Sequence, residues 1–131
     1  MKNKAYFFTF LISYFLIFLL AGCQWKENYV TQYGFTAEKI SASVLEPTSD
    51  GFKLQIPLSD FSCLPASFKL YLDKNNNDLT MTLKGTETTE HCYYKFYANV
   101  SGAKPGAYQL KVIYQKAEEN QEIFSQQFTI Q

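Results

Sequence analysis

Alternation of apolar and polar side chains, residue by residue, is the feature that most restricts the fold of this chain. From Thr36 onward, apolar residues recur at every second position in short segments divided by polar turns. The seven segments are residues 40–44, 52–58, 68–72, 79–83, 94–100, 108–114 and 124–130. Successive side chains of a β-strand point to opposite faces, so each segment is predicted to be a strand with one buried face.

Seven such strands predict an all-β domain in which two antiparallel sheets pack as a β-sandwich. A small closed β-barrel is the alternative. Residues 105–112, with the sequence PGAYQLKV, resemble the penultimate strand of immunoglobulin-like and fibronectin-like modules. In those modules a tyrosine, here Tyr108, closes a corner at the start of the strand. The resemblance therefore implies an immunoglobulin-like sandwich.

The first 22 residues have the composition of an export signal. Two lysines stand near the start, and the apolar run of residues 5–21 follows them. Small residues end this run, as a peptidase cleavage site requires. We therefore predict a cleaved signal helix over residues 1–22, with an uncleaved transmembrane helix as the alternative.

The end of this run, Leu20-Ala21-Gly22-Cys23, resembles the lipobox of bacterial lipoproteins. In that family the signal is cleaved before the cysteine, and the thiol carries a diacylglyceryl group. The resemblance implies that Leu20, Ala21 and Gly22 are recognition residues and that Cys23 is the lipid anchor. The membrane is then one expected partner of the protein.

These interpretations divide the chain into three parts. We expect a lipoprotein signal peptide over residues 1–22, a lipidated N-terminus and tether over 23–35, and a β-sandwich domain over 36–131. Gln24 follows the anchor cysteine. In Gram-negative lipoproteins an aspartate at that position retains the protein in the inner membrane. Its absence predicts a place in the cell envelope at the outer membrane, facing the periplasm or the cell surface.

Two cysteines remain once the lipobox has taken Cys23. In an oxidising compartment, Cys63 and Cys92 are predicted to form a structural disulfide. A redox-active pair is typically separated by two residues, a spacing that does not occur here. A zinc site needs more ligands than these cysteines and the lone His91 supply. We therefore expect a disulfide and no metal site.

The charge composition argues against a nucleic-acid partner. The chain has 12 basic and 12 acidic residues and a net charge of zero, and all of its basic residues are lysines. Proteins that bind nucleic acids usually present a basic stripe and arginine side chains that read phosphate and guanine. Neither feature is present in the sequence.

No motif in the sequence indicates an active site. There is no Gly-x-Ser-x-Gly elbow, no glycine-rich phosphate loop and no recognisable acid–base pair of carboxylates. The lone histidine stands beside a cysteine, where a surface or turn role is the more frequent one. Residues 73–78, DKNNND, partly resemble a calcium loop, but a hairpin turn explains the same letters better. We predict a protein that is not an enzyme and has no cofactor beyond the covalent lipid on Cys23.

The outer faces of the predicted strands carry Tyr71, Tyr93 and Tyr97 among lysines. Tyrosine is enriched in protein interfaces because its ring buries area while its hydroxyl stays in water. The sequence therefore predicts an envelope lipoprotein whose sandwich binds another protein through these tyrosines. Two alternatives remain: an inhibitor or immunity protein that blocks a periplasmic hydrolase or toxin, and a module that binds glycan or peptidoglycan.

Overall fold

The computed structural model describes residues 28–117 and 119–131, and within them it shows eight strands and one short 3₁₀ turn. The predicted signal peptide, its recognition residues and Cys23 lie outside the described residues. No helix in the described part of the chain has the length and hydropathy needed to cross a membrane. The strands are β1 (Val30–Thr36), β2 (Val44–Pro47), β3 (Gly51–Ser62), β4 (Lys69–Asn75), β5 (Asp78–Lys84), β6 (His91–Ser101), β7 (Gly106–Gln115) and β8 (Asn120–Ile130).

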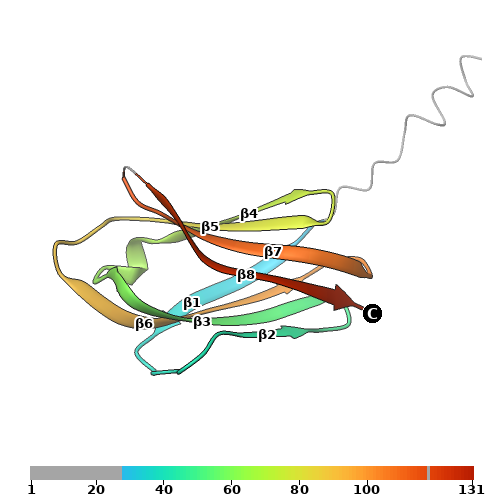
Figure 1. Cartoon of the computed structure of the whole chain (residues 1–131), viewed down its shortest axis with the longest axis horizontal. Helices are drawn as coiled ribbons and strands as arrows, with labels where there is room; N and C mark the ends of the chain where they lie inside the picture. Colours follow the sequence, from blue (N-terminus) through green and yellow to red (C-terminus); the bar gives the residue numbers. More distant parts are fainter. Residues whose placement is uncertain (1–27, 118) are drawn as a thin grey trace, which may run out of the picture.

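The strands form two four-stranded sheets that pack face to face (Figure 1). The first sheet has the order β1-β6-β3-β2 and the second the order β4-β5-β7-β8, and neither closes into a barrel. The predicted β-sandwich is therefore confirmed. The expectation that every pair is antiparallel is wrong at one place, because β5 and β7 are parallel neighbours. Between β5 and β7 the chain crosses to the first sheet and forms β6 there. It returns to the second sheet as β7, which runs in the same direction as β5.

The core lies between the sheets and consists of the apolar side chains at every second strand position. The alternation predicted from the sequence thus marks the buried faces of β3, β5, β6 and β7 correctly. Fully buried members come from both sheets: Phe52, Leu54, Ile56, Phe61, Leu79, Met81, Leu83, Phe96, Leu110, Val112 and Ile130. Tyr108 donates a hydrogen bond to the carbonyl oxygen of Lys104 at 2.6 Å, which is the corner contact expected for the start of β7.

Two of the predicted boundaries are corrected by the structure. The sequence predicts a tether up to residue 35, but β1 begins at Val30 and pairs along its length with β6. The first predicted strand, residues 40–44, is mostly a loop, and β2 follows it at Val44–Pro47. The sandwich therefore includes residues from 30 onward and has one strand more than predicted.

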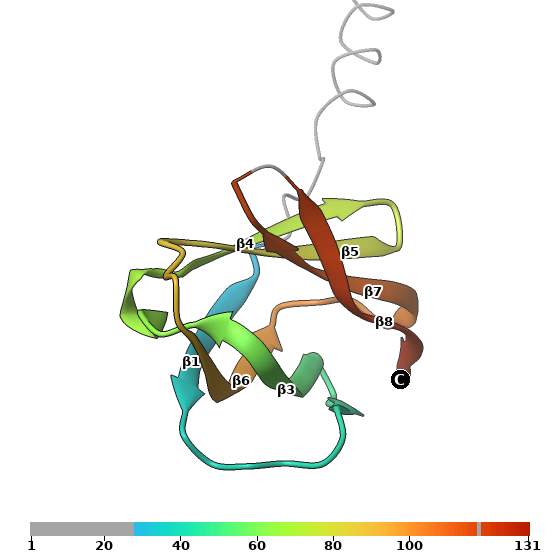
Figure 2. The same ribbon diagram turned by 60° about the vertical axis from the view of Figure 1, so that its left-hand side comes forward.

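The loop of residues 37–43 crosses the outer face of the first sheet, because β1 and β2 lie at its opposite edges (Figure 2). Two contacts hold the loop to β6. Lys95 forms an ion pair with Glu38. The Tyr93 hydroxyl accepts a hydrogen bond from the amide of Ile40 at 2.9 Å and donates one to its carbonyl oxygen at 3.0 Å. The loop covers part of this face.

The described chain begins at one end of the sandwich, which we call the N-terminal end. Val30 pairs with Ser101, and Gly51 pairs with the same residue, so the β2–β3 turn and the β6–β7 loop lie at this end too. The opposite end holds the connection of residues 63–68, between β3 and β4, and the loop of residues 85–90, between β5 and β6. We call it the stapled end because a disulfide joins the connection of residues 63–68 to the start of β6.

Candidate functional site

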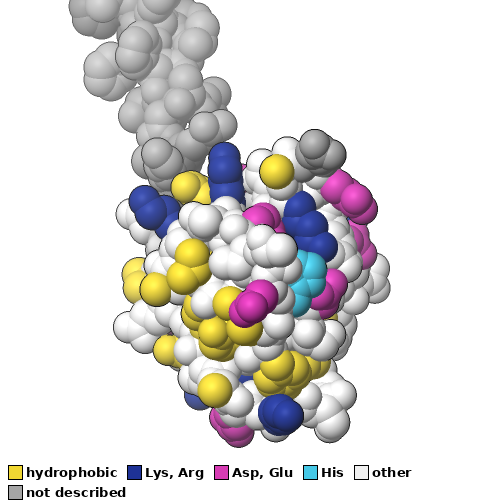
Figure 3. Space-filling view, turned by 90° about the vertical axis from the view of Figure 1, so that its left-hand side faces the viewer, with side chains coloured by type: hydrophobic (Ala, Val, Ile, Leu, Met, Phe, Trp, Pro, Cys, Tyr) yellow, Lys and Arg dark blue, Asp and Glu magenta, His cyan; other side chains and the backbone are white. Residues whose placement is uncertain are grey.

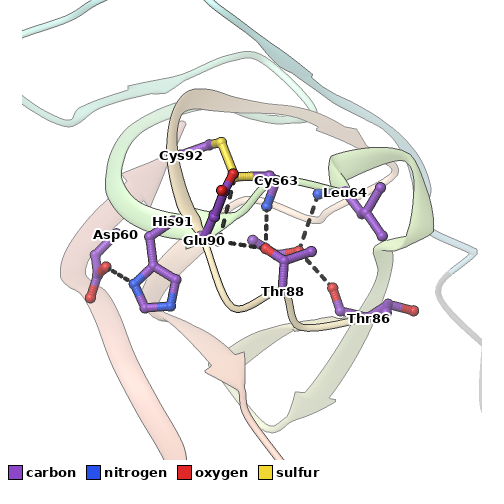
Figure 4. Close-up of a disulfide and its surroundings, with 9 residues drawn as sticks. Asp60, Cys63, Leu64, Thr86, Thr88, Glu90, His91 and Cys92 are labelled. Atoms are coloured by element: carbon purple, nitrogen blue, oxygen red, sulfur yellow. Dashed lines mark hydrogen bonds and ion pairs between the residues drawn. A yellow bond between two sulfur atoms is a disulfide. The ribbon is translucent and has the colours of Figure 1, made fainter.

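The disulfide between Cys63 and Cys92 joins the connection of residues 63–68 to the start of β6 at the stapled end (Figure 4). Cys63 directly follows β3, and Cys92 is the second residue of β6. The Cα atoms of the two residues are 5.1 Å apart. The disulfide predicted from the cysteine count is thus present in the structure.

Side-chain hydrogen bonds add to the disulfide at this end. The Ser62 hydroxyl is fully buried and donates to the Thr86 carbonyl oxygen at 2.6 Å. The Thr88 hydroxyl accepts from the Cys63 amide at 2.8 Å and donates to the Glu90 carbonyl oxygen at 2.6 Å. Backbone groups of two irregular segments are therefore satisfied by serine and threonine side chains. These contacts hold both loops in one arrangement.

A large apolar side chain is exposed at this end: Leu64 is 51% exposed. Its amide donates to the Ser62 hydroxyl at 3.2 Å, and its carbonyl oxygen accepts from the Ser67 hydroxyl at 2.7 Å. Pro65 then begins the 3₁₀ turn Pro65–Ser67. Figure 3 looks onto this end and shows hydrophobic side chains gathered across its centre. A rigid backbone thus presents a leucine to solvent.

An acidic flank borders this apolar centre. The carboxylate of Asp60 on β3 forms a hydrogen-bonded pair with Nδ1 of His91, the first residue of β6. The register of β3 against β6 shifts between Leu58 and Phe61. This β-bulge breaks the alternation, so that Ser59 and Asp60 are both exposed before Phe61 returns to the core. The bulge therefore gives the Asp60 carboxylate its outward position.

A second bulge lies in β8, whose register against β7 shifts where Ile113 pairs with Glu122. The two bulges border a hollow of about 270 Å³. Its polar lining comes from Ser59, Asp60, Tyr114, Gln121 and Glu122, and its apolar lining from Pro57, Leu58, Phe61 and Ile123. β2 pairs with β3 only as far as Gln55, so the rest of β3 is a free edge on that side and tolerates Pro57. The hollow therefore lies between this part of β3 and the strands β7 and β8 of the second sheet.

The hydroxyl of Tyr114 lies in a buried and acidic environment. The residue is 2% exposed, and its buried hydroxyl lies beside the carboxylate of Glu87. Burial raises the pKa of Tyr114 above its usual value, and the carboxylates of Glu87 and Asp60 raise this pKa further. The phenol therefore stays neutral at any physiological pH.

This pKa shift predicts a dependence of stability on alkaline pH. In the unfolded chain a tyrosine ionises near pH 10, whereas folded Tyr114 keeps its proton there. The contribution of Tyr114 is therefore complete below about pH 10 and is lost as the pH rises above that value. We expect the free energy of unfolding to fall less steeply above pH 10 in Tyr114→Phe than in the wild type. Urea denaturation at pH 8 and pH 11 measures this difference, with Tyr71→Phe as the control, and equal slopes in all three proteins contradict the assignment.

The three tyrosines predicted as contacts do not form one patch. Tyr71 lies on β4 of the second sheet and is 50% exposed. Tyr93 and Tyr97 lie on β6 of the first sheet, on the face that the loop of residues 37–43 crosses. The Tyr93 hydroxyl is hydrogen-bonded to the backbone of Ile40. The Tyr97 ring packs on Gly34, and a Cβ atom added to Gly34 would lie only 2.5 Å from the Tyr97 hydroxyl oxygen. The single contact face expected from these residues is therefore wrong.

The segment compared with a calcium loop is a tight hairpin turn. Asn75 pairs with Asp78 at the end of the β4–β5 ladder, and Asn76 has a φ of 55°, which asparagine tolerates better than most residues. Within residues 28–117 and 119–131, no group of three or more acidic, histidine or cysteine side chains is placed to hold a metal ion. The turn explanation is confirmed.

The stapled end combines a pair of polar side chains with an exposed apolar side chain. His91 and Asp60 form a pair of the kind that orients a general base, with the exposed Ser59 directly before Asp60 in sequence and the buried Ser62 two residues after it. The Ser62 hydroxyl donates to the Thr86 carbonyl oxygen. The end also offers an exposed leucine, an acidic flank and a hollow on a rigid frame.

The sequence does not point to the residues that form this end, apart from the two cysteines. Leu64 lies between two alternating segments and belongs to neither of them. The alternation identifies Tyr114 only as a core residue. One signal is present: Ser59-Asp60 interrupts the alternation of an otherwise regular strand. Comparison with known proteins adds no further guide, because no family model, curated protein or solved structure matches the chain.

Proposed function

We propose that this chain is a lipid-anchored protein of the bacterial cell envelope, whose β-sandwich binds another protein and is not an enzyme. The observation that carries the binding role is the exposed Leu64 on the stapled end. Binding an ordered surface avoids the entropy cost of ordering its loops, so a rigid apolar group is a suitable centre for an interface. The disulfide and the hydrogen bonds of Ser62 and Thr88 supply this rigidity.

The anchoring half of the proposal rests on the lipobox and has its own test. The full chain is expressed in a bacterial host with two membranes, beside the variant Cys23→Ala. We expect the wild type to sediment with the outer membrane and to have the mass of a chain that begins at an acylated Cys23. The variant is expected to lack the lipid mass. Wild-type protein without lipid, or confined to inner-membrane vesicles, contradicts the anchor or its outer-membrane location respectively.

The binding half is tested by photo-crosslinking in living cells. A photoreactive amino acid replaces Leu64, and separate variants carry it at Tyr71 and at Val44. All three positions are exposed, but Tyr71 lies on the open face of the second sheet and Val44 on an edge strand of the first. We expect one abundant crosslink to an envelope protein from position 64 and none from position 44. A crosslink from position 71 alone moves the interface to the open sheet face.

The identity of the crosslinked protein separates the two protein-binding roles. The inhibitor or immunity role has one structural feature in its favour. The connection that begins at Cys63 is fixed by the disulfide to Cys92 and by the hydrogen bond from the Cys63 amide to Thr88, and a loop fixed in this way resembles a preorganised blocking element. A hydrolase or toxin crosslinked at position 64, and inhibited by the purified chain, establishes that role. A structural envelope protein without such activity establishes an assembly role.

A further inference from the structure

The free edge of β8 differs from the other sheet edges of the sandwich. β8 is the last strand of the second sheet, and only β7 pairs with it (Figure 2). Its residues 123–130, with the sequence IFSQQFTI, contain no charged residue and no proline. An uncharged edge can pair with a further strand, and monomeric proteins usually interrupt such edges with charges, prolines or short strands. This edge is therefore open to strand addition.

The other edges of the two sheets carry such interruptions. β2 is four residues long and includes Glu46 and Pro47. β4 carries Lys69 and Asp73 within seven residues. β1 is uncharged but includes Gly34, and glycine weakens strand pairing. Among the described strands, β8 thus has the longest edge without an interruption.

The backbone groups of every second residue of β8 point to this free edge. The Gln109 amide donates to the Asn77 carbonyl oxygen at 3.0 Å, so the backbone groups of Gln109 face β5. Gln127 lies opposite Gln109 in the register of β7 against β8. In an antiparallel ladder, the backbone groups of such a non-hydrogen-bonded pair point away from each other. The amide and carbonyl groups of Ser125, Gln127 and Thr129 therefore lie on the open side of β8, and all three residues are exposed.

This row of backbone groups is complementary to a second copy of itself. When two β8 strands pair antiparallel about a two-fold axis at Gln127, Gln127 faces its own copy and Ser125 faces Thr129 of the second copy. Each pair exchanges both of its backbone hydrogen bonds, which gives about six bonds in all. The side chains fit as well, because glutamine amides can donate to and accept from each other, and serine–threonine pairs hydrogen-bond across strands. No like charges meet along residues 123–130.

We propose that two copies of this chain form a symmetric dimer by pairing their β8 edges. The two second sheets then join into one continuous sheet across the two-fold axis. On the inner face of this sheet, Phe124 lies opposite Ile130 of the second copy. Phe124 is only partly buried within one copy, so the dimer removes more of its ring from water. The inference goes beyond the proposed function, which concerns a different protein at the stapled end.

The path of the tether fits two copies anchored in one membrane, and this step alone rests on the proposed anchor. A two-fold axis perpendicular to the paired sheets places the first sheets of both copies on the same side. β1, which follows the tether, belongs to the first sheet. The two anchors therefore leave the dimer at the same height along the axis. The seven residues from Cys23 to Val30 span at most about 25 Å, so both lipids can enter a bilayer that is perpendicular to the axis.

The pairing leaves the stapled ends free for another protein. Gln127 lies close to Ile130, which pairs with Gly106 at the N-terminal end. The two copies run in opposite directions from this contact, because their β8 strands are antiparallel. Their stapled ends thus lie at opposite extremes of the dimer, and Leu64 stays exposed in each copy.

The test measures the mass and the edge protection of the mature, lipidated chain, purified in a large excess of detergent micelles. We expect sedimentation at matched detergent density to give twice the protein mass of one chain. Amide exchange at Ser125, Gln127 and Thr129 is expected to be at least about tenfold slower in the dimer than after dilution to the monomer. The variant Gln127→Lys places like charges opposite each other at the two-fold axis. Its dissociation constant is expected to rise at least about tenfold.

Gln32→Lys is the matched control, because it makes the same change at an exposed position of β1, the other uncharged edge. It should dimerise as the wild type does, and the amide of Gln126, which faces β7, should stay protected in every folded variant. The inference is overturned by single-chain mass at all concentrations, by a dimer whose edge amides are unprotected, or by a dimer that Gln127→Lys weakens no more than Gln32→Lys does. None of these measurements depends on the membrane location or on Leu64, so a failure of the dimer is separate from a failure of the proposed function.

Discussion

Replacing Phe61 by alanine is expected to lower the free energy of unfolding by about 3–5 kcal/mol, which is the upper range for a large-to-small change in a protein core. Phe61 is 1% exposed and stands where β3 returns to the core after its bulge. Its ring centroid lies 4.5 Å from that of Phe68, 4.8 Å from that of Tyr114 and 5.3 Å from that of Phe35. The ring thus contacts both sheets and the connection between them, and its removal leaves a cavity that these neighbours can fill only in part.

Equilibrium urea denaturation, with the disulfide intact, measures this loss. Leu64→Ala is the matched control, because it removes a large apolar side chain from the same end but from an exposed position. Its effect is expected to stay within about 0.5 kcal/mol. A Phe61→Ala variant that loses less than about 1.5 kcal/mol contradicts the role of this ring as the centre of the aromatic cluster.

Removing the disulfide with Cys63→Ala/Cys92→Ala is expected to lower the free energy of unfolding by about 3–4 kcal/mol. The bond joins residues 29 apart, and the chain-entropy model gives this range for a closed loop of that length. A second effect is local: the amides of Cys63 and Leu64, which donate to Thr88 and Ser62, should lose protection from hydrogen exchange.

The two effects are separated by comparing urea midpoints with exchange rates. Reduction of the wild type should reproduce the stability of the double variant, and a reducing agent should not change the variant. An unchanged urea midpoint shows that the bond does not constrain the unfolded chain. Unchanged exchange at Leu64 shows that the side-chain hydrogen bonds hold the loops without the bond.

The buried faces of the strands could be predicted because the face on which a strand residue lies follows from its position in the local two-residue alternation. Each inward side chain of β5, Leu79, Met81 and Leu83, follows a two-residue period that needs no knowledge of its neighbours. β1 escapes this prediction although Thr31, Tyr33 and Phe35 share the same period. It is an edge strand with only one partner strand, so its residues are less apolar, and Gly34 lowers its strand propensity.

The outer tyrosines show why the site could not be predicted in the same way. Alternation places Tyr93 and Tyr97 on an outer face correctly, but whether an outer face is open depends on the order of the strands. Because β1 and β2 occupy opposite edges, their connection must cross that face, and it meets Tyr93 there. Strand order arises from long-range packing and leaves no mark at the tyrosines themselves.

The pairing of β1 with β6 has a consequence for how this domain folds. Val30 pairs with Ser101 and Thr36 with Lys95, so β1 can pair only with a strand that is distant in the sequence. β6 is also the partner of β3, and it separates the parallel strands β5 and β7 along the chain. Such a high contact order is typical of domains that fold in milliseconds to seconds. The hairpins β2–β3, β4–β5 and β7–β8 can form from neighbouring residues, whereas the sandwich is complete only after β6 has docked.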